Sequence, residues 1–339
     1  MMGWSWRQLL LLLLPAVVGA IPSTPHYFTE QRVDHFGTSD ATFSQRYYSS
    51  DVHFKGPGHP IFVVIGGEGA VPPSTGLFYP FVVDDLAAEF SALVVQPEHR
   101  FYGTSLPFGD SSFTNGHLNL MTAEQALADT AHFALATQRK HNCSATRGTP
   151  GYCPIVTVGG SYPGWLSAMM RLRYPAVVDM AYSASAPTLM YAQQIDQYAY
   201  YKVIASSMEK SVAGCVGAAR VAFAAVASAL RTPGSKASVV EKLGICTPLP
   251  TYLEKGDEAL FQDELMMVMM YSWADQNMGN WPPKNSSLFR ACTAMVEDHN
   301  KGEQTNRACL EVSLWPTDPW LDTGRDRHLP FRQPPAISW

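Results

Sequence analysis

The stretch Ile155-Val-Thr-Val-Gly-Gly-Ser-Tyr-Pro-Gly-Trp165 decides the fold of this chain of 339 residues. Its β-branched start predicts a buried strand, two glycines break that strand, and a helical pattern begins directly after Ser161. A strand, a sharp turn and a helix around a serine are typical of a nucleophile elbow, which raises the serine hydroxyl at the end of a parallel sheet. Glycines are needed there because the strand and helix backbones pass too close for side chains.

An ordinary loop is the alternative interpretation, because Gly-Gly-Ser is a common turn sequence. The strand before the serine and the helix after it, which ends near Pro175, favour the elbow. One departure is Pro163, which stands where the pattern has glycine, with Gly164 one place later. Proline is tolerated in a first helical turn, so the elbow is retained. The backbone N–H of Tyr162 is then an expected oxyanion donor.

Strand and helix patterns alternate along the chain before this turn. We expect strands over 59–65 and 92–96, a helix over 81–90, and a second helix that starts at a capping box of Thr122 and Gln125. Together with the elbow and a further strand after it, this βαβ series predicts an α/β fold with a mostly parallel sheet.

A glycine loop, Gly66-Gly67-Glu68-Gly69, follows the first of these strands. It lacks the lysine and the spacing of a phosphate-binding P-loop. In a hydrolase of this architecture the loop after an early strand donates the second oxyanion N–H, so we assign that role to Gly67 or Glu68. Glu68 is also a candidate for binding a cationic substrate terminus, although a glutamate in a polar loop is more often only solvated.

Two segments place a histidine beside charged residues, and both are interpreted as structural. Asp34-His35 lies in an aromatic-rich N-terminal region, 27–48, that fits a strand or hairpin better than a catalytic pair. His99 lies between Glu98 and Arg100 at the end of a predicted strand, where an ion pair explains the charges better than a catalytic base.

The N-terminal composition predicts passage into the secretory pathway. Arg7, the apolar run from Leu9 to Leu14 and the small residues Val18-Gly19-Ala20 predict a signal peptide over 1–20. A membrane span is disfavoured because the apolar stretch is short. The formal net charge of −5 implies no nucleic-acid partner.

Cysteine usage agrees with a secreted or lysosomal or vacuolar protein. Six cysteines imply three disulfides, and spacing alone allows fifteen connectivities. None forms a Cys-x-x-Cys pair, so we expect neither a zinc site nor another cofactor. Asn142 and Asn285 lie in glycosylation sequons.

The sequence pattern changes after Pro187. Helical patterns dominate there, and four of the six cysteines fall in this part. We therefore expect an α/β core over 21–190, a disulfide-stapled helical cap over 191–310 and an atypical tail over 311–339.

Several segments, in order, resemble one known family: the lysosomal and secreted serine exopeptidases that include Pro-X carboxypeptidase, dipeptidyl peptidase II and thymus-specific serine protease. The resemblance covers about Tyr27 to Met190 and weakens in the helical part. It rests on Asp34-His35-Phe36, Thr42-Phe43-Ser44-Gln45-Arg46-Tyr47, Gly66-Gly67-Glu68-Gly69, Glu98-His99-Arg100-Phe101-Tyr102-Gly103-Thr104-Ser105-Leu106-Pro107-Phe108, Leu118-Asn119-Leu120-Met121-Thr122-Ala123-Glu124-Gln125-Ala126-Leu127-Ala128-Asp129, Gly159-Gly160-Ser161-Tyr162 and Ser183-Ala184-Ser185-Ala186-Pro187.

The resemblance implies an α/β-hydrolase domain with a helical cap and cleavage of peptides beside proline or small residues at a terminus. Ser161 matches the nucleophile, and Trp165 matches a residue that lines the pocket for the residue before the cut. The resemblance also pairs Cys215 with Cys292 and Cys246 with Cys309, and Cys143 and Cys153 are expected in a disulfide as well.

The C-terminal end departs from the family pattern. Asp318-Pro319-Trp320 follows closely after the last cysteine, and His328 comes ten residues later, whereas the family's aspartate and histidine lie well beyond the cap. Either Asp318 and His328 form a compressed catalytic end, or the chain stops before its acid and base. The second interpretation is favoured because the tail 329–339 has no strand pattern.

Three hypotheses follow from the sequence. The first is an active serine exopeptidase that uses Ser161, His328 and Asp318. The second is a truncated, catalytically weak or inactive family member that at most binds peptides. The third is an esterase on the same scaffold. The choice between amino-terminal and carboxyl-terminal cleavage stays open, as does the oligomeric state, with a homodimer as one option.

Overall fold

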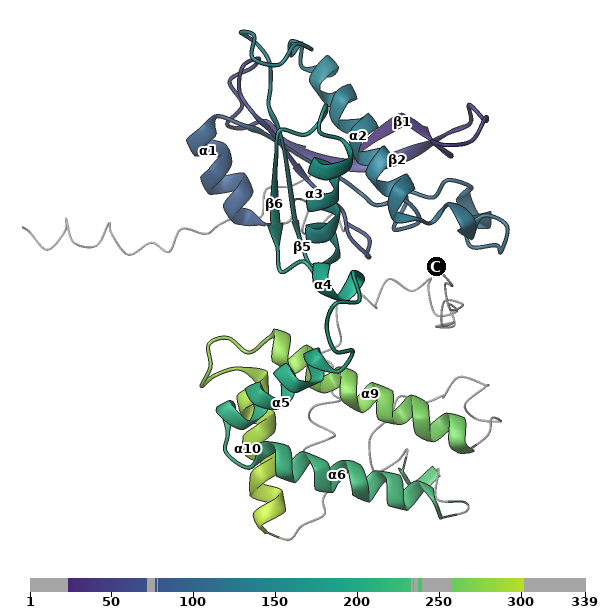
Figure 1. Cartoon of the computed structure of the whole chain (residues 1–339), viewed down its shortest axis with the longest axis vertical. Coiled ribbons are helices and arrows are strands. Elements are labelled where there is room, and N and C mark those ends of the chain that lie inside the picture. The colour runs from purple at the N-terminus through teal and green to yellow at the C-terminus, as the bar shows by residue number, and fades with distance from the viewer. Residues whose placement is uncertain are drawn as a thin grey trace, which may run out of the picture. The chain divides into compact units, whose positions relative to one another are not determined.

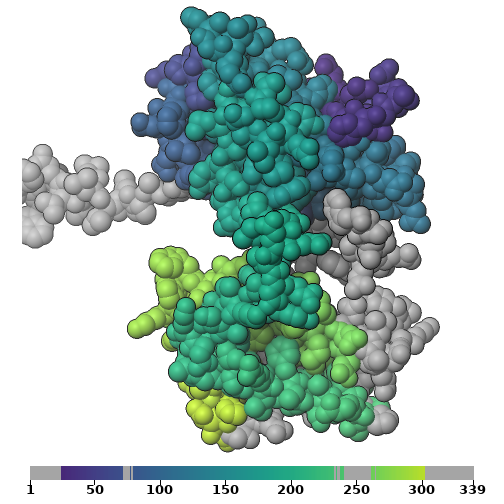
Figure 2. Space-filling view, in the orientation of Figure 1, coloured from purple at the N-terminus to yellow at the C-terminus, as the bar shows by residue number. Residues whose placement is uncertain are grey.

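The computed structural model describes residues 24–301, apart from 72–76, 78, 233, 235, 236 and 240–257. The chain divides into two compact units, 1–194 and 195–339. Figure 2 shows that each unit is built from a contiguous stretch of chain. The predicted signal peptide, the tail with Asp318 and His328, and the Cys246–Cys309 pair lie outside the described residues.

The first unit contains a mixed, mostly parallel sheet. Among the described residues it has six strands in the order β1-β2-β4-β3-β5-β6. Strands β4, β3, β5 and β6 are parallel, whereas β1 and β2 form an antiparallel hairpin that pairs antiparallel with β4. The strands are β1 (His26–Arg32), β2 (Thr42–Ser50), β3 (Ile61–Val64), β4 (Leu93–Pro97), β5 (Ile155–Gly160) and β6 (Met180–Ala184). The predicted α/β fold is confirmed.

Helices cover both faces of this sheet (Figure 1). Along β3, Ile61 and Val63 pack in a cluster with residues of α2 (Ala123–Lys140) and α3 (Tyr162–Arg173). Phe62 and Val64 point to the other face, against η1 (Phe81–Leu86) and α1 (Ala87–Phe90). This alternation follows from the two-residue period of a strand, and it explains why β3 is apolar at every position. The described part of this unit also contains three short helices: η2 (Gly109–Ser111), η3 (Leu118–Leu120) and α4 (Thr188–Tyr191).

Helix α2 begins at the predicted N-cap. The Thr122 side chain accepts a hydrogen bond from the Gln125 backbone N–H at 3.3 Å, an interaction typically worth about 1 kcal/mol. The Gln125 side chain does not return to Thr122 as a full capping box requires. It donates to Asp34 Oδ1 at 2.6 Å and accepts from the His35 backbone N–H at 3.0 Å, so it ties α2 to the N-terminal segment.

Buried ion pairs join the two segments that place a histidine beside charged residues. Arg100 binds Asp129 through two hydrogen bonds of 2.6 and 2.7 Å, and His35 Nε2 lies 2.8 Å from Asp129 Oδ1. Glu98 pairs with Arg46 on the neighbouring strand. Glu98 and Arg100 therefore each bind a distant partner, as the interpretation of these charges as structural ion pairs expects. The structural interpretation of Asp34-His35 stays a prediction.

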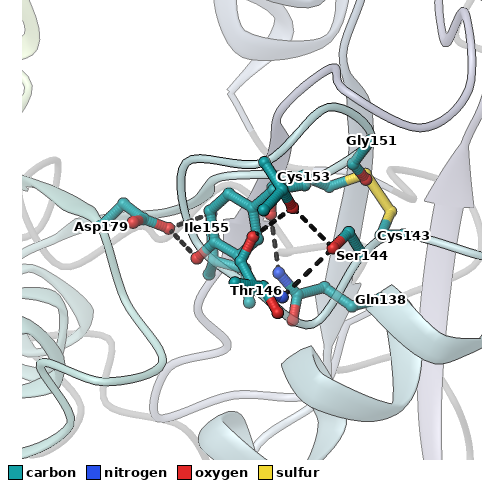
Figure 3. Close-up of a disulfide and its surroundings, with 10 residues drawn as sticks. Gln138, Cys143, Ser144, Thr146, Gly151, Cys153, Ile155 and Asp179 are labelled. Atoms are coloured by element: carbon teal, nitrogen blue, oxygen red, sulfur yellow. Dashed lines mark hydrogen bonds between the residues drawn. A yellow bond between two sulfur atoms is a disulfide. The ribbon is translucent and has the colours of Figure 1, made fainter.

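A disulfide closes the loop between α2 and β5 (Figure 3). Cys143 and Cys153 are bonded, with their Cα atoms 5.6 Å apart. The Gln138 side chain of α2 donates to the Cys153 carbonyl at 2.7 Å, and Asp179 accepts from the Ile155 N–H at 2.8 Å. These contacts fix the start of the strand that leads to Ser161.

The second unit is helical where the structure describes it. It contains α5 (Ala199–Ser211), α6 (Cys215–Leu230), α9 (Glu258–Met278) and α10 (Ser287–Asn300). The Cys215–Cys292 disulfide joins α6 to α10, as the family resemblance implied, and lies in a core with Trp273 and Leu288. No single described helix is long and apolar enough to cross a membrane, and only the bent pair α5 and α6 passes such a test when taken together. The role of the second unit as a cap stays a prediction.

Candidate active site

Ser161 occupies a strained turn between β5 and α3. Its backbone has φ 59° and ψ −129°, a conformation that L-residues rarely adopt, and the residue is exposed. The Ser161 N–H donates to the Ala184 carbonyl of β6 at 3.0 Å, and its carbonyl accepts from the Trp165 N–H at 3.1 Å. The turn is therefore held from the neighbouring strand and from the following helix. This is the predicted elbow geometry.

Two glycines permit the close approach of strand and helix at this turn. A Cβ atom at Gly159 would lie 2.1 Å from the Pro163 carbonyl oxygen. A Cβ atom at Gly164 would lie 2.6 Å from the Ala184 carbonyl oxygen. Gly164 thus meets the backbone of the neighbouring strand, which explains why the shift of this glycine by one position, with Pro163 before it, leaves the elbow intact.

The two expected oxyanion donors lie on either side of Pro163. Tyr162 is the first residue of α3, where helical N–H groups lack a partner within the helix and the helix dipole favours negative charge. On the other side, a Cβ atom at Gly67 would lie 2.8 Å from Pro163 Cγ, so the loop after β3 packs directly against the elbow. The structure thus brings Gly67 beside the segment that carries Ser161 and Tyr162.

The Tyr162 side chain is fixed by a histidine. His99 Nδ1 lies 2.7 Å from the Arg100 carbonyl oxygen, which only accepts hydrogen bonds, so this nitrogen carries the proton. Burial lowers the pKa of His99 below its usual value, which favours the neutral ring. His99 Nε2 therefore accepts from the Tyr162 hydroxyl at 3.0 Å. No sequence pattern indicated this pair, apart from the position of His99 at the end of a predicted strand.

A pocket of about 280 Å³ opens beside Tyr162. Glu68 contributes the negative charge of this pocket, while Trp165 is not among its lining residues. Trp165 instead stacks on Tyr162 and meets the Tyr191 ring edge-on, with centroid distances of 6.4 and 5.2 Å. The lining residues are Glu68, His99, Tyr102, Met121, Thr122, Ala123, Tyr162 and Tyr191.

The remaining predicted groups either fall outside the described residues or stay predictions. Asp318 and His328 lie outside the described residues, and within 24–301 no hydrogen bond between Ser161 Oγ and a histidine is present. The described part of the chain holds no cluster of three or more side chains suited to a metal ion. Both sequon asparagines, Asn142 and Asn285, are exposed, and their glycosylation stays a prediction.

Sequence comparisons identify similar proteins. Mouse lysosomal Pro-X carboxypeptidase is 36% identical over 66% of this chain and 44% of its own length. The human protein of that name is 34% identical over 72% of this chain and 49% of its own length. Mouse thymus-specific serine protease is 36% identical over 68% of this chain and 44% of its own. The chain thus spans about half the length of the curated relatives it matches.

One solved structure, a thioesterase domain from the curacin biosynthetic pathway, aligns at 17% identity over 46% of this chain and 42% of its own, with a TM-score of 0.30, which is too low to support an inference. The family model described as serine carboxypeptidase S28 matches residues 31–317. That match includes strands β2 to β6, the elbow, the pocket and the described helices of the second unit. On this basis the chain, with its mostly parallel α/β sheet, belongs to the serine carboxypeptidase S28 family.

Proposed function

We propose that this protein is a serine exopeptidase whose nucleophile is Ser161. The observation that carries the proposal is the elbow itself. An exposed serine is held at φ 59° between a parallel strand and a helix, in a chain that belongs to a serine peptidase family. Backbone strain of this kind persists only where surrounding structure enforces it, and it is concentrated at functional sites.

The proposed chemistry is acyl transfer. Ser161 Oγ attacks the scissile carbonyl carbon, and the negative oxygen that develops accepts hydrogen bonds from the Tyr162 and Gly67 N–H groups. The leaving amine departs with a proton, and water then hydrolyses the acyl-enzyme. One oxyanion donor is worth roughly 10²-fold to 10³-fold in rate, which exceeds the contribution of most single contacts.

The acid and base of the triad are assigned to Asp318 and His328, the candidates from sequence. His328 would take the proton from Ser161, and Asp318 would orient the imidazole. The alternative is a protein that binds peptides but turns them over weakly, because a serine without its histidine keeps only a residual fraction of the rate. The two alternatives predict different effects of His328→Ala. If His328 is the base, the substitution lowers activity strongly; if the protein lacks a functional base, its weak activity stays unchanged.

The substrates are proposed to be peptides cut next to proline or a small residue, in the secretory or lysosomal pathway. The proline preference and the lysosomal location are carried over from relatives whose names describe a lysosomal Pro-X carboxypeptidase, and the small-residue preference is carried over from the family resemblance. Glu68, at the pocket beside the elbow, and Trp165, packed on Tyr162, are proposed to contact the substrate.

Hydrolysis of a proline-containing peptide tests the proposal. We expect activity in the protein and a loss of at least about 10³-fold in Ser161→Ala, since the nucleophile is removed. Ser206→Ala is the matched control, because Ser206 is an exposed helical serine of the second unit. An equal rate in both variants would contradict the proposal. Faster hydrolysis of a simple acyl ester than of the peptide would favour the esterase alternative.

A further inference from the structure

The pocket beside Tyr162 combines one carboxylate with several aromatic rings. Its lining comes from five regions of the first unit: the loop after β3, the turn after β4, the start of α2, helix α3 and helix α4. Three of the lining residues are tyrosines, at positions 102, 162 and 191. Among the residues that the structure describes, no lysine or arginine lines this pocket. An organic cation is attracted both by a carboxylate and by the faces of aromatic rings.

Glu68 carries the negative charge of the pocket. Within the described residues no lysine, arginine or histidine forms an ion pair with the Glu68 carboxylate, although five other carboxylates of this unit or the next are paired. The one histidine of the lining, His99, is held neutral by burial, which lowers its pKa. The pocket therefore has an unbalanced negative charge.

The negative charge of Glu68 affects the pKa of two tyrosines of the pocket. Burial first, and the Glu68 charge second, raise the pKa of Tyr102 and of Tyr191. Both phenols therefore stay neutral over the physiological range, so their rings remain available to a cation. Glu68 and these tyrosines line the same pocket although they come from separate segments of the chain.

We infer that this pocket is a subsite for a cationic group of the peptide substrate, an ammonium or a guanidinium, held by the Glu68 carboxylate among the rings of Tyr102, Tyr162 and Tyr191. The inference rests on the proposed function, because Tyr162 directly follows the proposed nucleophile. The cation has two sources in a peptide: the free α-amino group and a basic side chain. If the α-amino group is the source, the protein cleaves from the amino end.

Calorimetric titration of the full chain with three matched peptides tests the subsite. Ser161→Ala serves as the background, so that no peptide is consumed. The probes are Ala-Pro-Ala with a free α-amino group, the same peptide N-acetylated, and acetyl-Lys-Pro-Ala. We expect one cationic peptide to bind about fivefold more tightly than the neutral one, as for a favourable contact with a partly solvated carboxylate. If the pocket binds the α-amino group, Ala-Pro-Ala should bind more tightly than its N-acetylated form. If the pocket binds a basic side chain, acetyl-Lys-Pro-Ala should bind more tightly than that neutral peptide.

Glu68→Gln should abolish this advantage. Glu124→Gln is the matched control, because Glu124 is exposed, follows the lining residue Ala123 and is not itself in the lining. This control removes the same charge and should keep the advantage. Equal affinity of all three peptides, no binding of any of them, or an advantage that survives Glu68→Gln would overturn the inference. If the cation preference is present but unmutated protein neither hydrolyses peptides nor reacts at Ser161, the proposed function fails while the subsite stands.

Discussion

Replacing Gly159 with alanine should displace the elbow. The added Cβ would lie 2.1 Å from the Pro163 carbonyl oxygen and 2.4 Å from its carbonyl carbon. An ordinary contact distance is about 3.5 Å, so the strand and helix would have to separate by about 1.4 Å. Both contacts are to backbone atoms, which cannot rotate away as a side chain does. The helix start must move, and Ser161 lies between the two clashing residues.

The cost of this change follows from the overlap. Overpacking of a buried site costs about 1 to 3 kcal/mol, and we expect the upper end, about 3 kcal/mol, because no flexible atom gives way. A displacement of about 1 Å at a reacting group can reduce the rate about 10²-fold. Gly159→Ala should therefore lower both the free energy of unfolding and the reactivity of Ser161 towards a fluorophosphonate.

Denaturant unfolding and the rate of fluorophosphonate labelling measure the two effects. Gly69→Ala is the control, because a Cβ atom there meets nothing within 4 Å and its φ lies outside the left-handed region. The control should unfold and react like the unmutated protein. If Gly159→Ala has the same unfolding midpoint and the same labelling rate as this control, the strand and helix do not approach as described, and the reasoning is refuted.

Three further predictions concern stability. Tyr162→Phe leaves the buried Nε2 of His99 without its hydrogen-bond donor, so the free energy of unfolding should fall by about 1 to 3 kcal/mol. Tyr102→Phe is the comparison, and it should lower the free energy of unfolding less. Because burial lowers the folded-state pKa of His99, the unfolded state binds the proton more readily; stability should fall as pH drops below about 6.5, and His99→Gln should flatten that slope in pH-dependent thermal unfolding. Replacing Cys215 and Cys292 together with alanine should cost about 4 kcal/mol, since their disulfide closes a loop with a sequence separation of 77 residues; a midpoint unchanged in denaturant would show that this bond does not stabilise the second unit.

The elements that sequence predicted well are those set by local pattern. The β-branched run before Gly159 predicted the start of β5 at Ile155, but the strand continues through both glycines, which were expected to break it, and ends at Gly160. Thr122 capped its helix as expected. The helix expected over 81–90 is present, although its first six residues are a π-helix. The hairpin of β1 and β2 was expected only as a strand or hairpin region, because pairing partners depend on contacts distant in sequence.

The site was predicted in part, and what was missed is set by side-chain geometry. The hydrogen bond from Tyr162 to His99 joins residues that are 63 positions apart, so no local pattern indicates it. In the same way, Glu98 and Arg100 were recognised as charged neighbours, but their partners come from other elements. The proximity of Gly67 to Pro163 depends on how the strands are ordered in the folded sheet. The sequence pattern around Gly67 does not indicate it, and it was expected only by analogy with hydrolases of this architecture.

Mass-spectrometric mapping of fluorophosphonate labelling tests the central claim most directly. An organophosphorus probe reacts with a serine hydroxyl that is exposed, activated and facing oxyanion donors. We predict that the folded protein carries the label on Ser161 and that the label disappears on unfolding or in Ser161→Ala. Folded protein in which Ser161 stays unlabelled, or reacts no faster than exposed Ser206, would contradict the account.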